Sequence, residues 1–482
     1  MNHQPLKNRC AVAAGLLVLA GCSTLVPPTQ TLDATAPLLP AHFDATSASQ
    51  ALSLRADDPL WWRQFADPSL ETVVALAVAH NTEVLLAQAR VQAASAQLAQ
   101  RGSERWPAVS IGSSAAQRRA SSDDPSRAGL SAQPGYRRNT TTWTANAAAS
   151  WDADLFGSLS AAERGAAQRL RSSVALAAQT QAAVAADAAT LLVNIRALEK
   201  RIVLADEAVA IESELAEIAQ AKRRGGAVSE ADVLRLRALV DGSTATREQL
   251  RGELEGQVQS LTVVLGSTPA QVRATLAERA AQLPAPPNVA ATGLPSELLR
   301  RRPDVVAALA DLGAASADLA ATAAQQYPSL RLTSSLGWIA ATAGSLGSGA
   351  AWFATLAPAL DWTVIDFGAA KARVGQRRAE ERQAWLRYQQ AVLTAFAQAD
   401  TAVRQLDLKR AEVLASTRAV VSQREAWTLL RLQYEHGLVD LTAALEARRM
   451  LNAGQTASVL AEQGHVNAAV NVYRAFGGAW DK

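Results

Sequence analysis

The clearest chemistry in this chain belongs to Cys22, which closes the run LAGC at residues 19–22. Lys7 and Arg9 precede a short apolar stretch, residues 11–20, in the layout of a secretory signal peptide that is too short to span a bilayer as a helix. The run has the form of a bacterial lipobox. We therefore expect an S-diacylglycerol on the thiol, cleavage before the cysteine, and N-palmitoylation of the new amine. An ordinary secretory peptide with a chance cysteine is the alternative.

Cleavage there removes residues 1–21 as a signal peptide, and Cys10 with them. The mature chain then carries a single cysteine, so it has no disulfide and must be held by packing or by partners. Residues 22–60 are rich in Pro, Thr, Ser and Ala. We expect them to form a lipidated extended segment that leads from the membrane to the folded body.

The remaining residues show no catalytic pattern. The five histidines are scattered, with neither a metal-binding His-Glu-x-x-His spacing nor a cysteine pair, and the sequence has no phosphate-binding loop. We expect no enzyme activity, no metal and no cofactor besides the covalent lipid. The formal net charge of +3 is nearly balanced and indicates no nucleic-acid partner.

Composition favours long helices. Of 482 residues, 49% are hydrophobic and only 5% aromatic, and alanine is abundant. Beyond the signal peptide, no apolar run reaches the roughly 18 residues that a transmembrane helix needs, so we expect no such helix.

The chain is an internal duplication. Residues 81–111 match residues 302–332 at a constant offset of 221, as Trp106 matches Tyr327. Farther along, residues 151–157 match 362–368 at an offset of 211, which also relates Gly226 to Gly437. We therefore expect two tandem repeats, residues 61–293 and 294–482.

Each repeat is expected to form a helix, two strands and two more helices. Helices over 69–105 and 296–326 end at an aromatic-Pro pair, because the residue before a proline is biased out of helix. Beyond each pair, apolar and polar residues alternate, with Trp143, Trp151, Trp352 and Trp362 near the ends, around loops at 115–139 and 339–351. This pattern is typical of a membrane β-strand with aromatic girdles, and a soluble hairpin is the alternative.

Four strands alone leave open edges in hydrocarbon, so transmembrane strands require an oligomer. Two copies would give about 8 strands, whose interior side chains fill, whereas three give about 12, which can leave a pore. Geometry favours a homotrimer.

Two long helices follow the strand pairs, over 158–224 and 369–434, and Gly225, Gly226 and Gly437 turn the chain back into helices over 227–265 and 438–476. A heptad seam indicates coiled-coil packing. In the first long helix it comprises Leu170, Val174, Ala177, Val184, Leu191, Ile195, Leu198, Ile202, Ala205 and Val209. A plain coiled-coil rod is the alternative interpretation.

Four stretches, residues 61–70 (WWRQFADPSL), 151–157 (WDADLFG), 293–304 (GLPSELLRRRPD) and 473–480 (YRAFGGAW), closely resemble the NodT-type branch of TolC/OprM-like outer-membrane efflux lipoproteins. The resemblance implies a mixed α and β fold, mainly long coiled-coil hairpins that form a periplasmic α-barrel, with four membrane strands per chain in a twelve-stranded trimeric β-barrel. Ser23, after the lipidated cysteine, resembles lipoproteins sorted to the outer membrane.

The resemblance also implies partners. They are a periplasmic adaptor (membrane fusion protein), an inner-membrane pump of the RND type, and outer-membrane lipid. The expected function is export of drugs, dyes or metals to the exterior by a lipid-anchored outer-membrane protein that extends into the periplasm. A type I protein-secretion conduit, or a non-channel coiled-coil lipoprotein scaffold, remains open.

The family's functional positions match two turns of this sequence. The tips expected to contact the adaptor comprise Arg223, Arg224, Gly226, Val228, Ser229, His436, Gly437, Leu438 and Val439. The periplasmic gate is expected at Asp440, Ala443 and Glu446, where threefold symmetry would make Glu446 a ring of carboxylates that favours cations. Alternatively the glycines only reverse the backbone, Glu446 is a solvated helix residue, and His436 is an exposed loop histidine without a pH role.

Overall fold

In a computed structural model of the chain, residues 60–121, 123, 136–277, 280–287 and 301–477 are described. The expected signal peptide, nearly all of the 22–60 segment and Cys22 lie outside them. The described residues divide into two compact units, one from within residues 92–171 and 309–386, the other from within residues 60–91, 172–287, 301–308 and 387–477. Each repeat contributes to both units, and each unit is described by itself.

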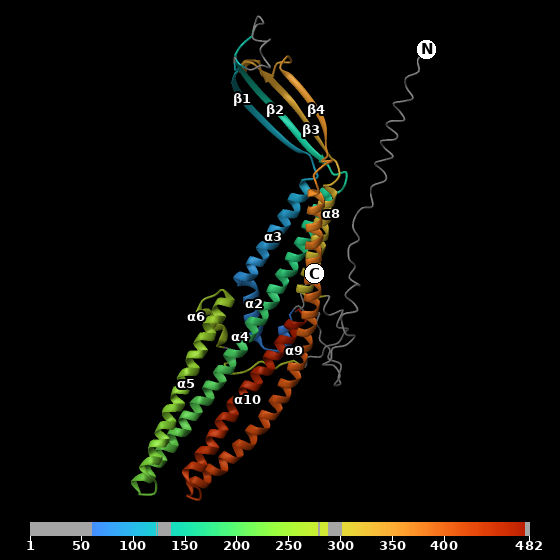
Figure 1. Ribbon diagram of the computed structural model, residues 1–482. Helices are drawn as coiled ribbons and strands as arrows, with labels where there is room; N and C mark the ends of the chain where they lie inside the picture. Colours follow the sequence, from blue (N-terminus) through green and yellow to red (C-terminus); the bar gives the residue numbers. More distant parts are fainter. Residues whose placement is uncertain (1–59, 122, 124–135, 278–279, 288–300, 478–482) are drawn as a thin grey trace. The chain divides into compact units, whose positions relative to one another are not determined.

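The first unit holds a four-stranded antiparallel sheet in the order β1-β2-β3-β4 (Figure 1). Its strands are β1 (Ala108–Arg119), β2 (Asn139–Ala153), β3 (Ser329–Ala340) and β4 (Trp352–Asp361). All four strands were expected. β1 was expected to give way to a loop at Ala115, which is wrong: pairing with β2 carries its polar end on to Arg119.

The two strand hairpins have the same register. Ala108 lies opposite Ser150 in the first hairpin, and Ser329 lies opposite Asp361 in the second. These pairs are related by the sequence offsets, 221 for the first strand and 211 for the second. The duplication seen in the sequence is therefore a structural duplication, and the pairing of β2 with β3 joins the two repeats.

The helix expected over 69–105 is two helices, α2 (Pro68–His80) and α3 (Thr82–Ser103), bent by 43°. Asn81 causes the break, because its backbone is extended and its side-chain oxygen accepts from the backbone N–H groups of Glu83 and Val84. The side chain thus caps the second helix. In the second repeat α8 (Pro303–Ala324) is continuous, and the residues expected to precede it as helix are largely outside the described ones.

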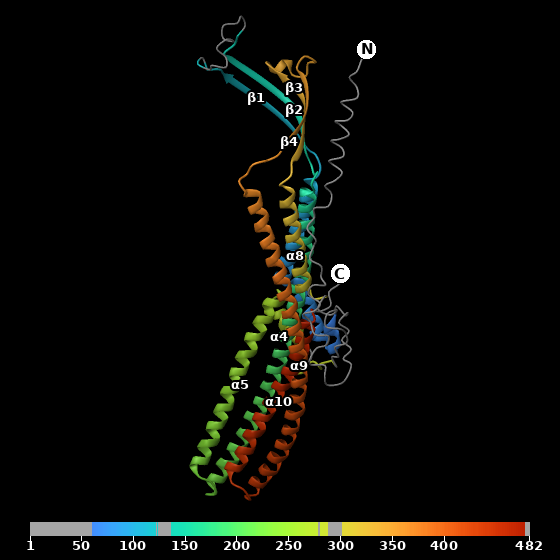
Figure 2. The same ribbon diagram turned by 45° about the vertical axis from the view of Figure 1, so that its right-hand side comes forward.

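Long helical hairpins make up most of the second unit: α4 (Ser158–Arg224) with α5 (Glu230–Leu265), and α9 (Ala369–Glu435) with α10 (Leu441–Ala475). Both long helices were expected, and α4 and α9 each have 67 residues. The turns that join the hairpins lie at the same end of the unit in both views (Figures 1 and 2). The helix α6 (Pro269–Leu276) follows α5.

The heptad seam is confirmed at four of its ten positions in α4, and five others are half-buried. Ala177, Val184, Ile195 and Leu198 are buried, whereas Val174 is exposed. In α9 the heptad pattern expected for the second long helix includes Trp427, which is buried. The mixed α and β fold class is confirmed.

By length and composition alone, α4 and α8 of the described chain are apolar enough to cross a membrane, as is the bent α2–α3 pair if it counts as one span. The expectation of no such helix is thereby corrected. It rested on an uninterrupted apolar run, whereas these windows are rich in alanine and tolerate charges. Because 44% of the α4 window is buried within the chain, its alanines serve helix packing.

Candidate functional site: strand sheet, helix tips and helix junction

One face of the sheet is apolar and exposed. Pairing places Val109 opposite Ala149, Trp151 opposite Leu332, and Trp338 opposite Trp352. Directly opposed residues of antiparallel strands share a face. The exposed apolar residues on this face are Val109, Ile111, Trp151, Leu336, Trp338, Trp352, Leu356 and Leu360. Such a continuous apolar surface needs either lipid or protein to cover it.

The opposite face is polar. Arg331 forms an ion pair with Asp152 at 2.7 Å, and the Asn146 side-chain amide donates to the Ser335 hydroxyl at 2.9 Å. Both interactions cross from β2 to β3. A sheet with an apolar face and a hydrogen-bonded polar face matches a membrane strand between lipid and a water-filled lumen.

Tryptophans mark both ends of the apolar face, as expected. Trp143 and Trp151 lie on one face of β2, about 26 Å apart at the usual rise of a strand, close to the height of a membrane band. At one end, the indole N–H of Trp151 donates to the Arg105 carbonyl, and that of Trp362 donates to the Gln326 carbonyl. The two bonds are equivalent under the repeat offsets, so both repeats fix their tryptophan in the same way.

The helix tips close in the same way in both hairpins. Gly226 and Gly437 have positive φ, 78° and 75°. The Ala227 N–H donates to the Lys222 carbonyl, and the Leu438 N–H donates to the Gln433 carbonyl. Each turn is a Schellman motif, which requires a left-handed residue at the position that glycine fills.

At the tip surface, Arg223, Arg224, Ser229 and His436 are exposed, and Leu438 is 74% exposed. Val228 and Val439 are half-buried, and Val439 packs against the core beneath the tips. The tips therefore present basic and apolar side chains on a rigid turn. The adaptor contact expected there stays a prediction.

The returning helices begin with side-chain caps. Ser229 and Asp232 form a reciprocal capping box at the start of α5. Asp440 accepts from the Ala443 N–H at 3.0 Å and caps α10. Two of the three expected gate residues thus share one helix cap. Glu446, one turn on, is exposed and pairs with Arg449 at 3.5 Å. Its role in a gate stays a prediction.

Below the tips, one apolar core includes residues from all four hairpin helices, among them Leu215, Leu236, Trp427 and Leu451. The Lys222 ammonium lies over the Tyr434 ring, 4.3 Å from its centre, and donates to the Tyr434 carbonyl. These contacts couple the two hairpins near their turns.

A buried acid lies beside this core. Glu212 of α4 is 1% exposed, and the Asn452 amide of α10 donates to it. Burial raises the pKa of the Glu212 carboxyl above its ordinary value, and Ser243, Arg448 and Asn452 partly offset this. Burial lowers the pKa of the Arg448 guanidinium, which lies over the Trp427 ring. Sequence reasoning missed both, because a charged residue inside a heptad pattern looks solvated until the facing helix is known.

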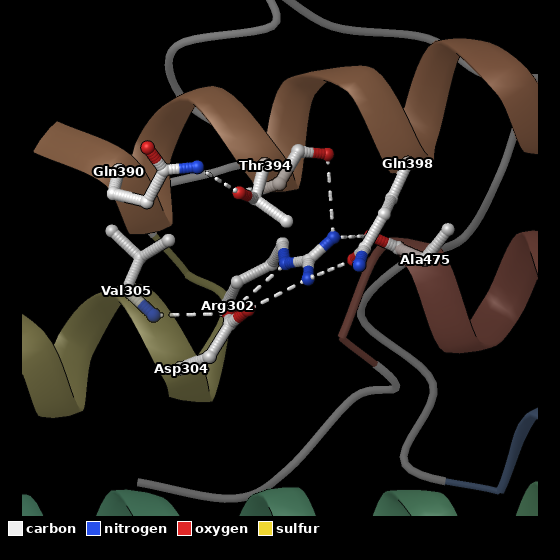
Figure 3. Close-up of polar contacts among 8 residues, drawn as sticks. Arg302, Asp304, Val305, Gln390, Thr394, Gln398 and Ala475 are labelled. Atoms are coloured by element: carbon white, nitrogen blue, oxygen red, sulfur yellow. Dashed lines mark hydrogen bonds and ion pairs between the residues drawn. The ribbon is translucent and has the colours of Figure 1, made fainter. Parts of the chain in front are cut away.

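Arg302 is a second charged side chain that the sequence did not single out, although it belongs to a stretch that carried the resemblance. It is 6% exposed and binds Asp304 at 2.7 Å (Figure 3). Its guanidinium also donates to the Gln398 side chain at 2.8 Å and to the Ala475 carbonyl. It joins the start of α8 to α9 and to the last turn of α10.

The first and last resembling stretches meet in the second unit. The rings of Trp61 and Tyr473 stack with centres 5.0 Å apart, and the Tyr473 hydroxyl donates to Gln64 at 2.8 Å. The start of the described chain is therefore fastened to the end of α10.

Among the residues that the structure describes, no cluster of three or more His, Cys, Asp or Glu could hold a metal ion. The chemistry available is that of surfaces: an apolar band, a polar face and two rigid tips. A chain with this sheet and these paired helical hairpins has the architecture of an outer-membrane channel subunit.

The model of the outer membrane efflux protein family matches residues 73–267 and 294–478, and the chain belongs to this family. It is 26% identical over 98% of its length to a toluene efflux pump outer membrane protein, TtgC, of Pseudomonas putida, covering 96% of that protein. It is 28% identical to the pyoverdine export outer membrane protein OpmQ of Pseudomonas putida, covering 98% of each chain.

The structure is also similar to that of the outer-membrane channel OprN, with a TM-score of 0.77 and 26% identity over 90% of this chain and 97% of that one. The expected family, location in the outer membrane and role in efflux are confirmed. The named relatives are channel components rather than enzymes.

Proposed function

We propose that three copies of this chain form a channel across the outer membrane, with a β-barrel that has no open sheet edge. This channel serves as the exit of a tripartite efflux system. The observation that carries this proposal is the four-stranded sheet with one exposed apolar face. Within the described residues β1 and β4 each pair with one strand only, so the sheet has two open edges. A membrane cannot satisfy those edges, whereas closing three sheets on one another does.

The channel is fed from the periplasm. We propose that the two helix tips bind a periplasmic adaptor, which connects the channel to an inner-membrane pump of the RND type. The exposed Arg223, Arg224 and Leu438 offer that partner charge and apolar area on turns whose backbone is fixed. Fixed turns lower the entropic cost of binding.

The lipid on Cys22 is proposed as an anchor, separate from the barrel. Several acyl chains on one residue hold a protein at a membrane durably, whereas one chain holds it weakly. Cys22→Ala should therefore reduce the amount of assembled channel in the outer membrane without removing its ability to conduct.

The cargo is proposed to be small toxic compounds such as drugs, dyes or metals. The relatives are named for export of toluene and of pyoverdine, which supports small organic cargo. A protein-secretion conduit would share the same architecture. Unchanged sensitivity of a deletion strain to all small compounds, together with loss of one secreted protein, would favour it.

The test is deletion of the gene, followed by a sensitivity screen over antibiotics, dyes, solvents and metals, with the wild-type gene restored as control. Efflux predicts increased sensitivity and higher intracellular retention of at least one compound. Copurification of an adaptor should be lost when Arg223, Arg224 and Leu438 are replaced together. Retention equal to wild type for every compound would contradict the proposal.

A further inference from the structure

An aromatic stack joins the two repeats inside the first unit. Phe156, which follows β2 in the first repeat, stacks on Tyr327, which precedes β3 in the second, with ring centres 4.8 Å apart and planes 18° apart. The strands that these residues flank are paired in the sheet. The stack therefore closes the seam between the repeats just beyond the strand ends.

Each of these two aromatic residues has an equivalent in the other repeat, and the two equivalents do not stack on each other within the chain. The offset of 211 relates Phe156 to Phe367, and the offset of 221 relates Trp106 to Tyr327. Phe367 follows β4 and is 100% exposed, and Trp106 precedes β1 and is 74% exposed. They lie at the two open edges of the sheet, one beyond each edge strand.

Phe367 is held in this exposed position by its neighbours. Its φ of 52° is rare for a residue with a side chain. The Asp366 carboxylate accepts from the N–H groups of Gly368 and Ala370, and so caps the start of α9. The loop thus presents a bulky ring to the outside and does not fold it inward.

We propose that, where the closed barrel brings β4 of one subunit beside β1 of the next, Phe367 of the first stacks on Trp106 of the second, and that the two strands keep the register that β2 and β3 use within the chain. The proposal rests on the proposed channel and names the contact that closes it. The partner is a second copy of the chain because only it offers the first-repeat edge that β4 lacks.

The register follows from the offsets, which already convert one hairpin into the other. Within the chain Ala149 lies opposite Ser334. Moving the first forward by 211 and the second back by 221 places Leu360 of one subunit opposite Ser113 of the next. Likewise Trp151 and Leu332 are replaced by Trp362 and Ile111. The apolar residues then stay on one face all round.

Two polar contacts of the internal seam have no counterpart between subunits. The first is the hydrogen bond of Asn146 with Ser335, whose equivalent positions hold Ala357 and Ser114. In the second, Arg331 and Asp152 form an ion pair inside the chain, but the equivalent positions hold Ser110 and Thr363. The seam between subunits thus replaces a charge pair by two hydroxyls. Its closing contact beyond the strands is aromatic, which makes Phe367 and Trp106 the side chains to test.

Cysteine pairs test the register in the full-length, membrane-inserted protein. Opposed residues of antiparallel strands have Cα atoms about 4.5–5.5 Å apart, within reach of a disulfide. Leu360→Cys with Ser113→Cys should give covalent dimers and trimers on non-reducing gels. The matched pair Ala149→Cys with Ser334→Cys should form its bond within one chain and leave the size unchanged.

Leu360→Cys with Val109→Cys is the negative control, because four residues of strand move the two thiols roughly 13 Å apart. Native mass spectrometry of the same samples separates the two levels of the proposal. If trimers form but the Leu360 and Ser113 cysteines do not crosslink, whether or not the Leu360 and Val109 cysteines do, the proposed register is wrong and the proposed channel is not contradicted. Absence of any oligomer overturns the channel itself.

A double-mutant cycle tests the stack. Phe367→Ala and Trp106→Ala should each lower the temperature at which the trimer dissociates in detergent, and the double variant should lose no more than the larger single loss. Phe156→Ala is the control, because the Phe156 stack lies within one chain. This substitution should lower the stability of the folded subunit more than it lowers the dissociation temperature of the trimer. Additive losses from Phe367→Ala and Trp106→Ala would contradict the contact.

Discussion

In each repeat, a side chain from an earlier part of the repeat donates a hydrogen bond to a carbonyl near the end of the returning helix. The carbonyl position is equivalent in the two repeats, but the donor side chain differs. In the first, the Asn81 amide donates to the Val264 carbonyl near the end of α5. In the second, Arg302 donates to the Ala475 carbonyl at the end of α10. The donors are related by the offset of 221 and the acceptors by 211. The duplication has kept the backbone connection while its chemistry diverged from a small amide to a buried cation.

That divergence has structural consequences. Asn81 caps α3 and bends the chain, so the first repeat begins with two short helices. Arg302 reaches farther and gathers Asp304, Gln398 and Ala475 around one guanidinium (Figure 3). The second repeat therefore depends more heavily on a single side chain, and substitutions at the two positions should differ in size.

The largest expected effect is that of Arg302→Ala. It leaves the Asp304 carboxylate and the Ala475 carbonyl without their buried partner, a loss of about 3–5 kcal/mol for a broken buried pair. The matched Asn81→Ala removes one cap and one hydrogen bond, worth about 2 kcal/mol. Thermal unfolding in detergent, followed by helical circular dichroism, measures both. Equal losses would show that the two junctions are energetically alike.

A smaller effect distinguishes the hairpins by pH. The offset of 211 relates Glu212 of α4 to Gln423 of α9. Burial raises the pKa of Glu212 above its ordinary value of 4.5, so the folded hairpin binds a proton more readily than the unfolded chain. The stabilising contribution is complete below 4.5 and is lost as pH rises through the folded pKa, with a slope of at most about 1.4 kcal/mol per pH unit.

Melting temperatures between pH 7 and pH 4.5 test this. Glu212→Gln should make the melting temperature less dependent on pH. Gln423→Glu should make it more dependent on pH, but by a smaller amount, because Gln423 is only half-buried. A slope unaltered by Glu212→Gln would show that this acid is not the source.

The sequence predicted the parts of this molecule that follow from local pattern. The repeats, the strands with their tryptophans, and the two long helices are periodic over many residues. The sequence did not reveal the break at Asn81, because an asparagine within an apolar helical period marks a cap only once its backbone is known to be extended. Nor did it reveal the burial of Glu212 and Arg302, which depends on helices far away in the chain.

The candidate site divides in the same manner. Gly226 and Gly437 were predicted as turns, and their positive φ confirms it. Asp440 was grouped with the gate, and its carboxylate caps α10. Cys22 lies outside the described residues, so its lipid stays a prediction. Periodicity in the sequence predicts the helices and strands. A gate made of equivalent residues from several copies can be located only in a structure of the oligomer.

Equal effects are expected at the tips. Gly226→Ala and Gly437→Ala should each cost about 1–2 kcal/mol, because both residues have left-handed backbones and no atom lies near the added methyl group. The losses should match, since the two turns share one motif. Thermal unfolding of both variants checks this. A cost at only one tip would show that the turns are not equivalent.

The smallest effect on stability is expected for Glu446→Ala. Its exposed ion pair with Arg449 contributes only about 0.3 kcal/mol to the free energy of unfolding. In planar bilayers, however, loss of a threefold ring of carboxylates should lower the preference for cations. Arg235→Ala, at the equivalent position of the first repeat, is the control and should not lower that preference. Unchanged selectivity in Glu446→Ala would place the gate elsewhere.

The most direct test of the central claim is the mass of the complex extracted gently from the outer membrane. Native mass spectrometry should give three copies of the chain that starts at Cys22, each heavier than the polypeptide by its lipid. A single copy of the chain in the extracted sample would contradict the account of a barrel that three open sheets close, whereas three copies without lipid would contradict only the proposed anchor.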